Sequence, residues 1–266
     1  MNSYIELSYM DIALAGMLLG INAMLSVYYK LGTEKRLVIA AVRMVVQLTL
    51  VGLILKALFA AVSPWLTLLA AIVMVGFAGR EAMARQERHF KGVWGYGLGT
   101  GSMFAAAGTV TFFALATQFH ADPWYDPRYA IPILGMILGN TMTGVSLALD
   151  RLLADADDGR ARIEARLALG HTFREALQMP LRNAMRAGLI PTVNGMAAAG
   201  LVSLPGMMTG QILAGVEPVQ AVKYQLLVMF LIAGGTALGV FAAVMLALKR
   251  LTDPRQRLRL DRLQGK

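Results

Sequence analysis

The sequence predicts an all-α fold, a polytopic membrane helix bundle of about seven transmembrane helices, and three observations lead to this prediction. Hydrophobic residues make up 57% of the 266 residues and charged residues only 15%, whereas soluble domains carry about 25% charged residues. The mean hydropathy is +0.57. The apolar residues are gathered in runs of roughly 20 residues, the length that a helix needs to cross a bilayer. Such a chain has too little polar surface to fold as a soluble globule.

The basic residues are distributed unevenly between the apolar runs. The chain has 25 Lys and Arg residues and a formal net charge of +9, which by itself would suit a nucleic-acid partner. All but four of these residues fall in the segments 30–36, 80–92, 150–187 and 249–266. Charge clustered between alternate spans is typical of cytoplasmic loops. We therefore expect a multi-pass protein with its N-terminus outside, its C-terminus in the cytoplasm and no nucleic-acid partner.

The first three spans are predicted from apolar runs that end at polar signals. The first run, about 10–29, is followed by the basic stretch KLGTEKR. The second, about 37–59, ends at a short neutral turn, and the third, about 65–79, leads into REAMARQERHFKG. The N-terminal stretch MNSYIELSYMD has no basic region and no small-residue cleavage site before the first run. We therefore expect no cleaved signal peptide.

Four further runs complete the predicted bundle. The fourth, about 93–118, is followed by HADPWYDPRY, whose aromatic residues are typical of a membrane interface. The fifth, about 130–149, precedes the long basic segment, and the seventh, about 221–248, precedes the basic tail. The sixth, about 188–212, contains proline and glycine in its second half, so we expect it to be broken or re-entrant. The whole chain, 1–266, is predicted to be a single transmembrane domain.

The cytoplasmic segment 150–187 contains an amphipathic stretch over 160–187. It follows the acidic turn Asp155–Gly159, which suits a helix start. Apolar residues recur four positions apart, and Arg and Glu fill the positions between them. These apolar residues are Ile163, Leu167, Leu169, Phe173 and Leu177. Pro180 is predicted to end or kink the helix. Two interpretations remain open, an interfacial helix lying on lipid and a docking element for a cytoplasmic partner.

Residues 203–218, SLPGMMTGQILAGVEP, are apolar but interrupted by proline and glycine. A break there frees backbone groups, which membrane proteins tolerate only inside protein or beside a watery cavity. We predict a gate or hinge over 204–211. Its candidate residues are Leu204, Pro205, Gly206, Met207, Met208, Thr209, Gly210 and Gln211. The alternative is a kinked helix that packs against a neighbour through Gly206 and Gly210.

Glycines four residues apart occur in several apolar runs. Such pairs lie on one helix face and let helices approach closely, within one chain or between copies. They stand at 16/20, 95/99, 97/101, 135/139, 206/210 and 235/239. The pattern favours tight helix packing and a homo-oligomer.

Polar residues inside the spans are candidates for a solute pathway. Arg43 is the ionised side chain lying well inside a span, with Gln47 one turn later on the same face. Asn140 and Asn194 lie in the fifth and sixth spans. Alternatively, Arg43 extends to the interface and the asparagines bond neighbouring helices. No Asp or Glu lies in a span interior, which favours an ATP-driven or passive mechanism over proton coupling.

Motifs for catalysis and for metal binding are missing from the sequence. The chain has no cysteine, which excludes a thiolate metal site, and its three histidines are scattered outside the spans and form no ligand cluster. Residues that bind a metal stay unknown from the sequence. The chain also has no paired intramembrane aspartates, no nucleophile motif and no Gly-x-x-x-x-Gly-Lys-[Ser/Thr] phosphate-binding loop. We therefore expect a protein that catalyses no reaction and binds no cofactor itself.

Several stretches resemble one family of membrane proteins. They are GLIPTVN, GLVSLPGMMTGQILAG and PVQAVKYQ within 188–225, together with VRMVVQLTLVG at 42–52 and IPILGMILGNTM at 131–142. They are similar to the FetB-type iron-export ABC transporter permease family, which is related to plant aluminium-tolerance ABC permeases. The resemblance covers nearly the whole chain. In addition, Glu164-Ala165-Arg166 with Gly170 and Pro180 resembles the coupling loop by which ABC permeases dock on their ATPase.

The resemblance implies the permease subunit of a two-component ABC transporter in a bacterial inner membrane. It implies a homodimer of permeases with separate cytoplasmic ABC ATPase subunits, which would bind ATP and Mg. It also implies export of iron or of another metal-related or small anionic solute, and an anionic or chelated solute would suit Arg43. The implied ATPase-coupling residues are Glu164, Gly170, Phe173, Leu177 and Pro180. The alternatives are a secondary transporter or channel without an ATPase, and a membrane scaffold that transports nothing.

Overall fold

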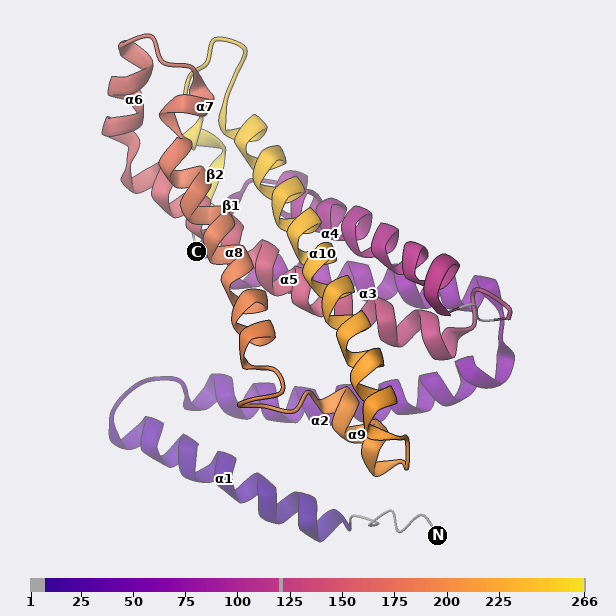
Figure 1. Ribbon diagram of the computed structural model, residues 1–266. Coiled ribbons are helices and arrows are strands. Elements are labelled where there is room, and N and C mark those ends of the chain that lie inside the picture. The colour runs from indigo at the N-terminus through magenta and orange to yellow at the C-terminus, as the bar shows by residue number, and fades with distance from the viewer. Residues whose placement is uncertain (1–7, 120–121, 266) are drawn as a thin grey trace. The chain divides into compact units, whose positions relative to one another are not determined.

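The structure, a computed structural model, describes residues 8–119 and 122–265 (Figure 1). Outside this description lie most of the N-terminal stretch used to exclude a signal peptide, the start of HADPWYDPRY and the last residue. The chain divides into two compact units. The first comprises Met1–Ala61 with Leu213–Val216, and the second comprises Val62–Ile212 with Glu217–Lys266. The units are described separately.

The first unit is a helical hairpin made of α1 (Tyr9–Tyr28) and α2 (Glu34–Ala61). Polar side chains close the connection between its two apolar helices. The buried hydroxyl of Ser26 donates to Glu34 at 3.0 Å and shares a hydrogen bond of 2.8 Å with the hydroxyl of Thr33. These bonds satisfy polar groups at the turn, so the hairpin connection is a folded feature.

The second unit is built around one long helix, α5 (Pro127–Asp158). It packs against α3 (Pro64–Arg85), α4 (Val93–Ala114), α8 (Gln178–Ala198) and α10 (Pro218–Leu251). Figure 1 shows α8 and α10 running beside α5 toward the same end of the unit. The apolar core lies between these helices, and α5 contributes eleven of its buried residues.

Six helices in the described part of the chain are long and apolar enough to cross a membrane by length and composition. They are α1, α2, α3, α4 with its π-helical continuation Leu115–Phe119, α5 and α10. The protein is therefore an all-helical, multi-pass membrane protein, as predicted. The expected sixth span is divided, because residues 199–205 are not helical. The following helix, α9 (Gly206–Leu213), has eight residues and is about 12 Å long, too short to cross.

Helices α5, α8 and α10 cross at very close range. A Cβ added to Gly144 of α5 would lie 2.8 Å from the carbonyl oxygen of Gly188 on α8, and one added to Gly188 would lie 2.7 Å from that of Gly144. Gly235 and Gly239 of α10 lie close to side chains of α5. A Cβ added to Gly235 would meet the side chain of Ile137, and one added to Gly239 would meet the methyl group of Thr141. The close helix contact predicted from the glycine spacing is confirmed at 235/239.

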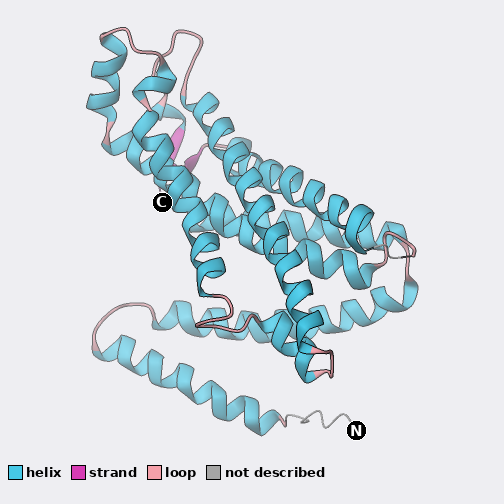
Figure 2. Cartoon of the chain, viewed as in Figure 1, coloured by secondary structure: helices cyan, strands magenta, loops and turns pink. Residues whose placement is uncertain are grey.

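Short elements gather at one end of the second unit (Figure 2). Two small helices follow α5, namely α6 (Arg160–Ala168) and α7 (Phe173–Ala176). An antiparallel pair joins β1 (Arg88–Phe90) to β2 (Leu263–Gly265), and a 3-10 turn, Leu260–Arg262, precedes β2. This strand pair is an addition to the predicted all-α fold. We call residues 86–91, 150–177 and 252–265 together the platform.

Candidate functional site

The predicted coupling segment, residues 150–187, contains α6, an amphipathic helix that packs on its own chain. Ile163 is completely buried, whereas the neighbouring Glu164 is exposed and accepts a hydrogen bond from Arg160 at 2.8 Å. After α6 the chain turns at Gly170, whose φ of +89° is a conformation that favours glycine. Glu164 and Gly170 are thus the predicted coupling residues that the fold leaves accessible to a partner.

The other three predicted coupling residues face the interior. Phe173 at the start of α7 is 6% exposed, Leu177 is completely buried and Pro180 is buried. Pro180 stands in the first turn of α8, where backbone N–H groups have no partner within the helix. A proline there removes no hydrogen bond of α8, and the preceding helix α7 ends at Ala176, so a helix ends just before Pro180, as predicted. The helical pattern is interrupted ten residues earlier, at Gly170.

A capping box fixes the start of α7. Thr172 accepts the backbone N–H of Glu175 at 3.3 Å, and the Glu175 carboxylate accepts the N–H and the hydroxyl of Thr172, each at 2.8 Å. The backbone hydrogen bond first, and then the hydroxyl, lower the pKa of Glu175. The ionised carboxylate is well placed at a helix N-terminus, where negative charge is favourable.

The acidic end of α5 ties the coupling segment to its neighbours. Asp155 accepts a hydrogen bond of 2.8 Å from Asn183 on α8. Arg88 on β1 forms ion pairs of 3.0 Å with Asp157 and 3.2 Å with Asp158. The acidic turn that the sequence suggested as a helix start is therefore the last turn of α5, and its carboxylates connect two other parts of the platform.

The C-terminal tail is folded against the same platform, which the sequence reading did not anticipate. Asp253 accepts the backbone N–H groups of Arg255 at 2.9 Å and Arg257 at 3.0 Å, and it also pairs with the Arg257 side chain at 2.7 Å. Led by the backbone bond from Arg257, these interactions lower the pKa of Asp253 to about 2. Arg262 donates to the carbonyl oxygens of Arg250 and Thr252, so it caps the end of α10.

One hydrogen bond joins the tail directly to the coupling segment. The side-chain oxygen of Gln256 accepts the backbone N–H of Phe173 at 2.8 Å. A cleft of about 560 Å³ lies on one side of this bond, between residues 164–172 and 255–258. A second cleft, of about 320 Å³, lies on the other side, between residues 172–174 and the end of α10 with its following turn. One residue in the sequence could have indicated the folded tail, namely Asp253. An aspartate side chain often accepts a hydrogen bond from the backbone N–H two residues later and so forms a turn.

The four predicted pathway residues fall in both units. Arg43 and Gln47 are exposed residues of α2 in the first unit. Asn140 on α5 and Asn194 on α8 are exposed residues of the second unit. Asn140 donates to the carbonyl oxygen of Met136 in its own helix at 2.8 Å. Their role in a pathway stays a prediction.

The predicted gate segment consists of a break followed by a short helix. Gly200, with φ +85°, donates to the carbonyl oxygen of Ser203 at 2.9 Å within the break. The carbonyl oxygen of Pro205 accepts the N–H and the hydroxyl of Thr209, so α9 starts at Gly206. The candidate gate residues Gly206 to Gln211 therefore lie within α9, whereas Leu204 and Pro205 lie in the break.

The alternative in which Gly206 and Gly210 form a helix contact finds no support within the described chain. A Cβ added to either glycine would meet no described heavy atom within 4 Å. Met207, Met208 and Thr209 are half-buried, and so is Gln211. This leaves one face of α9 open in the single chain.

The sequence reading missed a group of buried polar side chains in the second unit. Thr111, Thr141 and Thr236 each have a buried hydroxyl, and Gln225 has a buried amide oxygen, with no hydrogen-bond partner in the described structure. These residues come from α4, α5 and α10. Thr141 and Thr236 also lie at the glycine crossing. Thr141 and Thr236 could have been identified in the sequence, because each lies close to a pair of glycines four residues apart.

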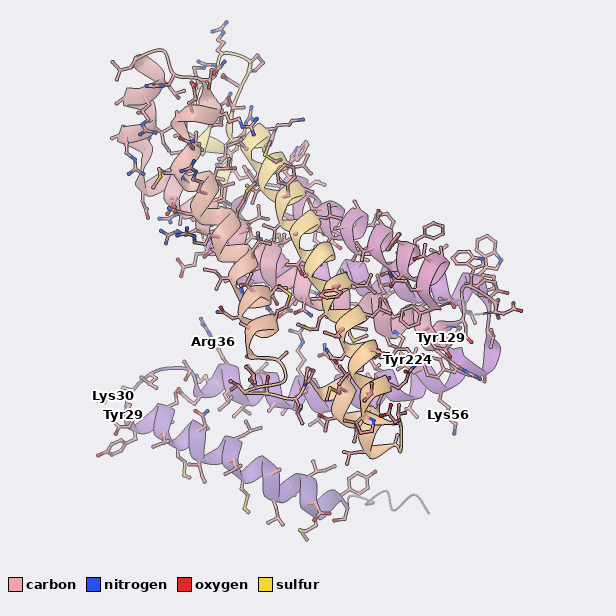
Figure 3. All side chains as sticks on the ribbon, in the orientation of Figure 1. Tyr29, Lys30, Arg36, Lys56, Tyr129 and Tyr224 are labelled. Carbon is pink, nitrogen blue, oxygen red and sulfur yellow. The ribbon has the colours of Figure 1, made fainter. Side chains whose placement is uncertain are left out.

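Two further observations concern the membrane environment. Tyr129 and Tyr224, labelled in Figure 3, lie near Phe119 at ring distances of 6.0 and 6.4 Å, and Figure 3 places them away from the platform end. Such aromatic residues are typical of a membrane interface. Among the described residues, no group of three or more His, Asp or Glu could hold a metal ion.

Comparison with known proteins gives consistent matches. A family model described as "Uncharacterised protein family (UPF0014)" matches residues 9–252. The chain is 37% identical over 260 residues to the UPF0014 membrane protein slr1647 of Synechocystis, covering 97% of this chain and 98% of the relative. It is 32% identical over 266 residues, the full length of both chains, to the Escherichia coli protein named "Probable iron export permease protein FetB".

A plant protein is also similar. The chain is 32% identical over 210 residues to the Arabidopsis thaliana protein named "Protein ALUMINUM SENSITIVE 3", covering 79% of this chain and 75% of the relative. No solved structure matches the chain.

Proposed function

The chain belongs to the UPF0014 family, and from this premise we propose that it is the permease subunit of a two-component ABC exporter. The resemblance to the FetB-type family inferred from the sequence motifs is confirmed by these matches. The proposal rests on one observation above the others, the alignment of the whole chain with a relative named a probable iron export permease. In this proposal the protein lies in a bacterial inner membrane as a homodimer and works with two separate cytoplasmic ATPase subunits.

The platform supports the ATPase part of the proposal. An exposed interfacial helix would keep an apolar face free for lipid. Here the apolar residues Ile163, Phe173 and Leu177 are buried in the chain's own core, and the large apolar side chain that stays exposed between 160 and 177 is Leu169. A rigidly held segment with a polar outer face suits a protein partner better than a membrane surface.

The mechanism follows from the connections of the coupling segment. ATP binding closes the partner's ATPase dimer and displaces α6 and the turn at Gly170. The hydrogen bond between Asp155 and Asn183 and the close crossing at Gly144 carry this displacement into α5 and α8. The helices then tilt and the segment 204–211 opens the pathway. ATP and Mg act on the partner, and this chain contributes the pathway and no catalytic group.

The names of two relatives support a metal-related solute. One is named for iron export and one for aluminium sensitivity. We propose iron or a related metal as the transported element, moved as an anionic complex or chelate. A bare cation would be repelled by Arg43, whereas an anionic complex would be attracted. Within the second unit, the amides of Asn140 and Asn194 would donate to ligand oxygens of such a complex.

Capture of the tagged protein from its native membranes tests the proposal. The membranes are solubilised in mild detergent, and co-purifying proteins are identified by mass spectrometry. We expect one stoichiometric soluble protein with a phosphate-binding loop, and we expect iron efflux from liposomes only when both proteins and ATP are present. Efflux from liposomes that contain this chain alone would instead establish a channel or a secondary transporter.

A further inference from the structure

We infer that the C-terminal loop, residues 252–258, forms one docking surface with the coupling segment and receives an acidic element of the ATPase. This inference rests on the proposed function, and it adds a second contact region to the segment at 160–177. The loop lies about 80 residues further along the chain, yet it forms the opposite wall of both clefts beside Phe173.

The hydrogen bond from Phe173 to Gln256 makes the two walls a single surface. Phe173 is the first residue of α7, so its N–H has no partner within the helix. Gln256 supplies that partner at 2.8 Å. Because Thr172 and Gln256 line both clefts, a displacement of the loop changes the coupling segment as well.

Contacts within its own chain hold the loop in one conformation. Asp253 is 5% exposed and accepts hydrogen bonds from two backbone N–H groups of the loop and from the Arg257 side chain. The backbone N–H of Arg259 also bonds the carbonyl oxygen of Leu251 at 2.8 Å, which brings the loop back to α10. A loop held in this way presents its remaining side chains in fixed positions, so little order needs to be gained on docking.

The charges of the two clefts define the partner. Asp253 is paired with Arg257, and Glu164 is paired with Arg160. Arg255 lines the larger cleft, and Arg174 and Lys249 line the smaller one. Within the described part of the chain these three cations form no salt bridge. The surface therefore carries three uncompensated positive charges around a concave opening, and these charges complement Asp and Glu side chains of a partner.

A membrane surface could also attract these cations, but the geometry favours a protein. Binding to anionic lipid is strengthened when an apolar face inserts beside the charges, and the apolar side chains of Ile163, Phe173 and Leu177 in this region are buried. In addition, Figure 1 shows the loop extending past the last turn of α10 alongside α6 and α7. A projecting, concave, charged surface fits an acidic protein segment.

Charge reversal tests the inference with the ATPase identified by membrane capture. Arg255→Glu and the double variant Arg174→Glu with Arg255→Glu are compared with Arg182→Glu. Arg182 is an exposed arginine on α8 that lines neither cleft, so this control makes the same charge change on the same side of the membrane. Binding of purified ATPase to each permease in neutral-lipid nanodiscs is measured by titration, with membrane insertion and monodispersity checked for each variant.

We expect the Kd for the ATPase to rise about tenfold for Arg255→Glu, more for the double variant, and less than twofold for Arg182→Glu. Equal Kd values for all variants would overturn the inference and leave the proposed function intact. Failure to capture any ATPase would overturn both. A loss of binding to vesicles with 30% anionic lipid, without a change in ATPase binding, would assign the surface to lipid instead.

A crosslink provides an independent readout. The chain has no cysteine, so Arg255→Cys introduces a unique thiol. A thiol-directed photocrosslinker at this position should attach to an Asp- and Glu-rich peptide of the ATPase. Attachment to a neutral or basic peptide would contradict the charge argument.

Discussion

Gly170 shows how one residue sets the shape of the coupling segment. Its φ of +89° lies in the region that residues with a Cβ rarely adopt. A Cβ added there would meet open space, so the constraint is one of backbone conformation alone. The residue therefore separates α6 from α7 without making any side-chain contact.

Gly170→Ala should weaken this turn by roughly 1–2 kcal/mol because the left-handed conformation strains any residue with a Cβ. We expect the protein to insert normally but to transport less solute per ATP hydrolysed. The measurement is the ratio of efflux to ATP hydrolysis in liposomes that contain both subunits. Gly97→Ala is the control, since its added Cβ meets only an ordinary contact at 4.0 Å within α4. An unchanged ratio would show that the turn is not part of the coupling.

Asp253 makes the order of the C-terminal loop dependent on pH. Its pKa falls from 3.8 to about 2 in the folded protein, chiefly through the backbone N–H of Arg257. A lowered pKa means that the folded state favours the carboxylate. Its stabilising contribution is therefore fully present above pH 3.8 and is lost as the pH falls through about 2.

Asp253→Asn should loosen the loop at neutral pH because the neutral amide is a weaker acceptor for Arg257. We expect faster hydrogen exchange at the backbone N–H groups of Arg255 and Arg257. The difference from the unmodified protein should shrink as the pH falls from about 4 to about 2, once exchange is corrected for its intrinsic pH dependence. A difference that stays constant over this range would rule out the Asp253 carboxylate as the cause.

At the scale of the helices, α5 and α8 approach each other backbone to backbone where they cross near α10. A Cβ added to either Gly144 or Gly188 would lie less than 3.0 Å from the backbone carbonyl oxygen of the other glycine. Backbone cannot move aside as a flexible side chain can. The crossing is therefore a fixed point about which the platform ends of these helices can tilt.

Gly144→Ala and Gly188→Ala should each destabilise the bundle by about 1–3 kcal/mol through overpacking. We expect a lower thermal unfolding midpoint in detergent for both variants. Gly139→Ala, also on α5, is the matched control, because its added Cβ meets nothing within 4 Å in the described structure. If all three variants unfolded at the same temperature, the helices would not be in close contact at Gly144.

The short helix α9 leads to a contrasting prediction. Gly206→Leu and Gly210→Leu add bulk where a Cβ meets no described atom, so the unfolding midpoint should stay within about 2 °C of the original. Transport should nevertheless fall, because the new side chains obstruct a segment that has to move. Efflux at an unchanged rate would remove 204–211 from the gating mechanism.

The apolar spans could be predicted from the sequence because hydropathy records directly which segments face lipid. The amphipathic spacing likewise identified Ile163, Phe173 and Leu177, which are all buried. The folded tail could not be predicted, since β2 depends on β1 about 175 residues away and no local pattern records such a pairing.

At the scale of the whole molecule, α10 connects the predicted gate with the platform. It follows α9 after a short turn, where Glu217 caps its start by accepting the N–H groups of Val219 and Gln220. It ends at the loop held by Asp253. With 34 residues it is about 51 Å long, more than the 40–45 Å of a bilayer with its headgroups. One uninterrupted helix therefore reaches both sites.

Removal of the residues after Leu251 tests how far the platform depends on the tail. The truncated chain should insert, because its apolar helices are intact, but its affinity for the ATPase should fall at least tenfold. Gln256→Leu, which removes only the acceptor for Phe173, should give a smaller loss in the same direction. Binding of the ATPase to the truncated chain with unchanged affinity would show that the coupling segment keeps its shape without the tail.

The position of β2 in the chain also has a consequence for biosynthesis. Residues 252–265 leave the ribosome after every membrane helix, and only then can they pair with β1 and support Phe173. A nascent or prematurely terminated chain therefore lacks the complete platform, however well its helices are inserted. If the proposed function holds, such a chain should bind the ATPase only after its last residues have folded.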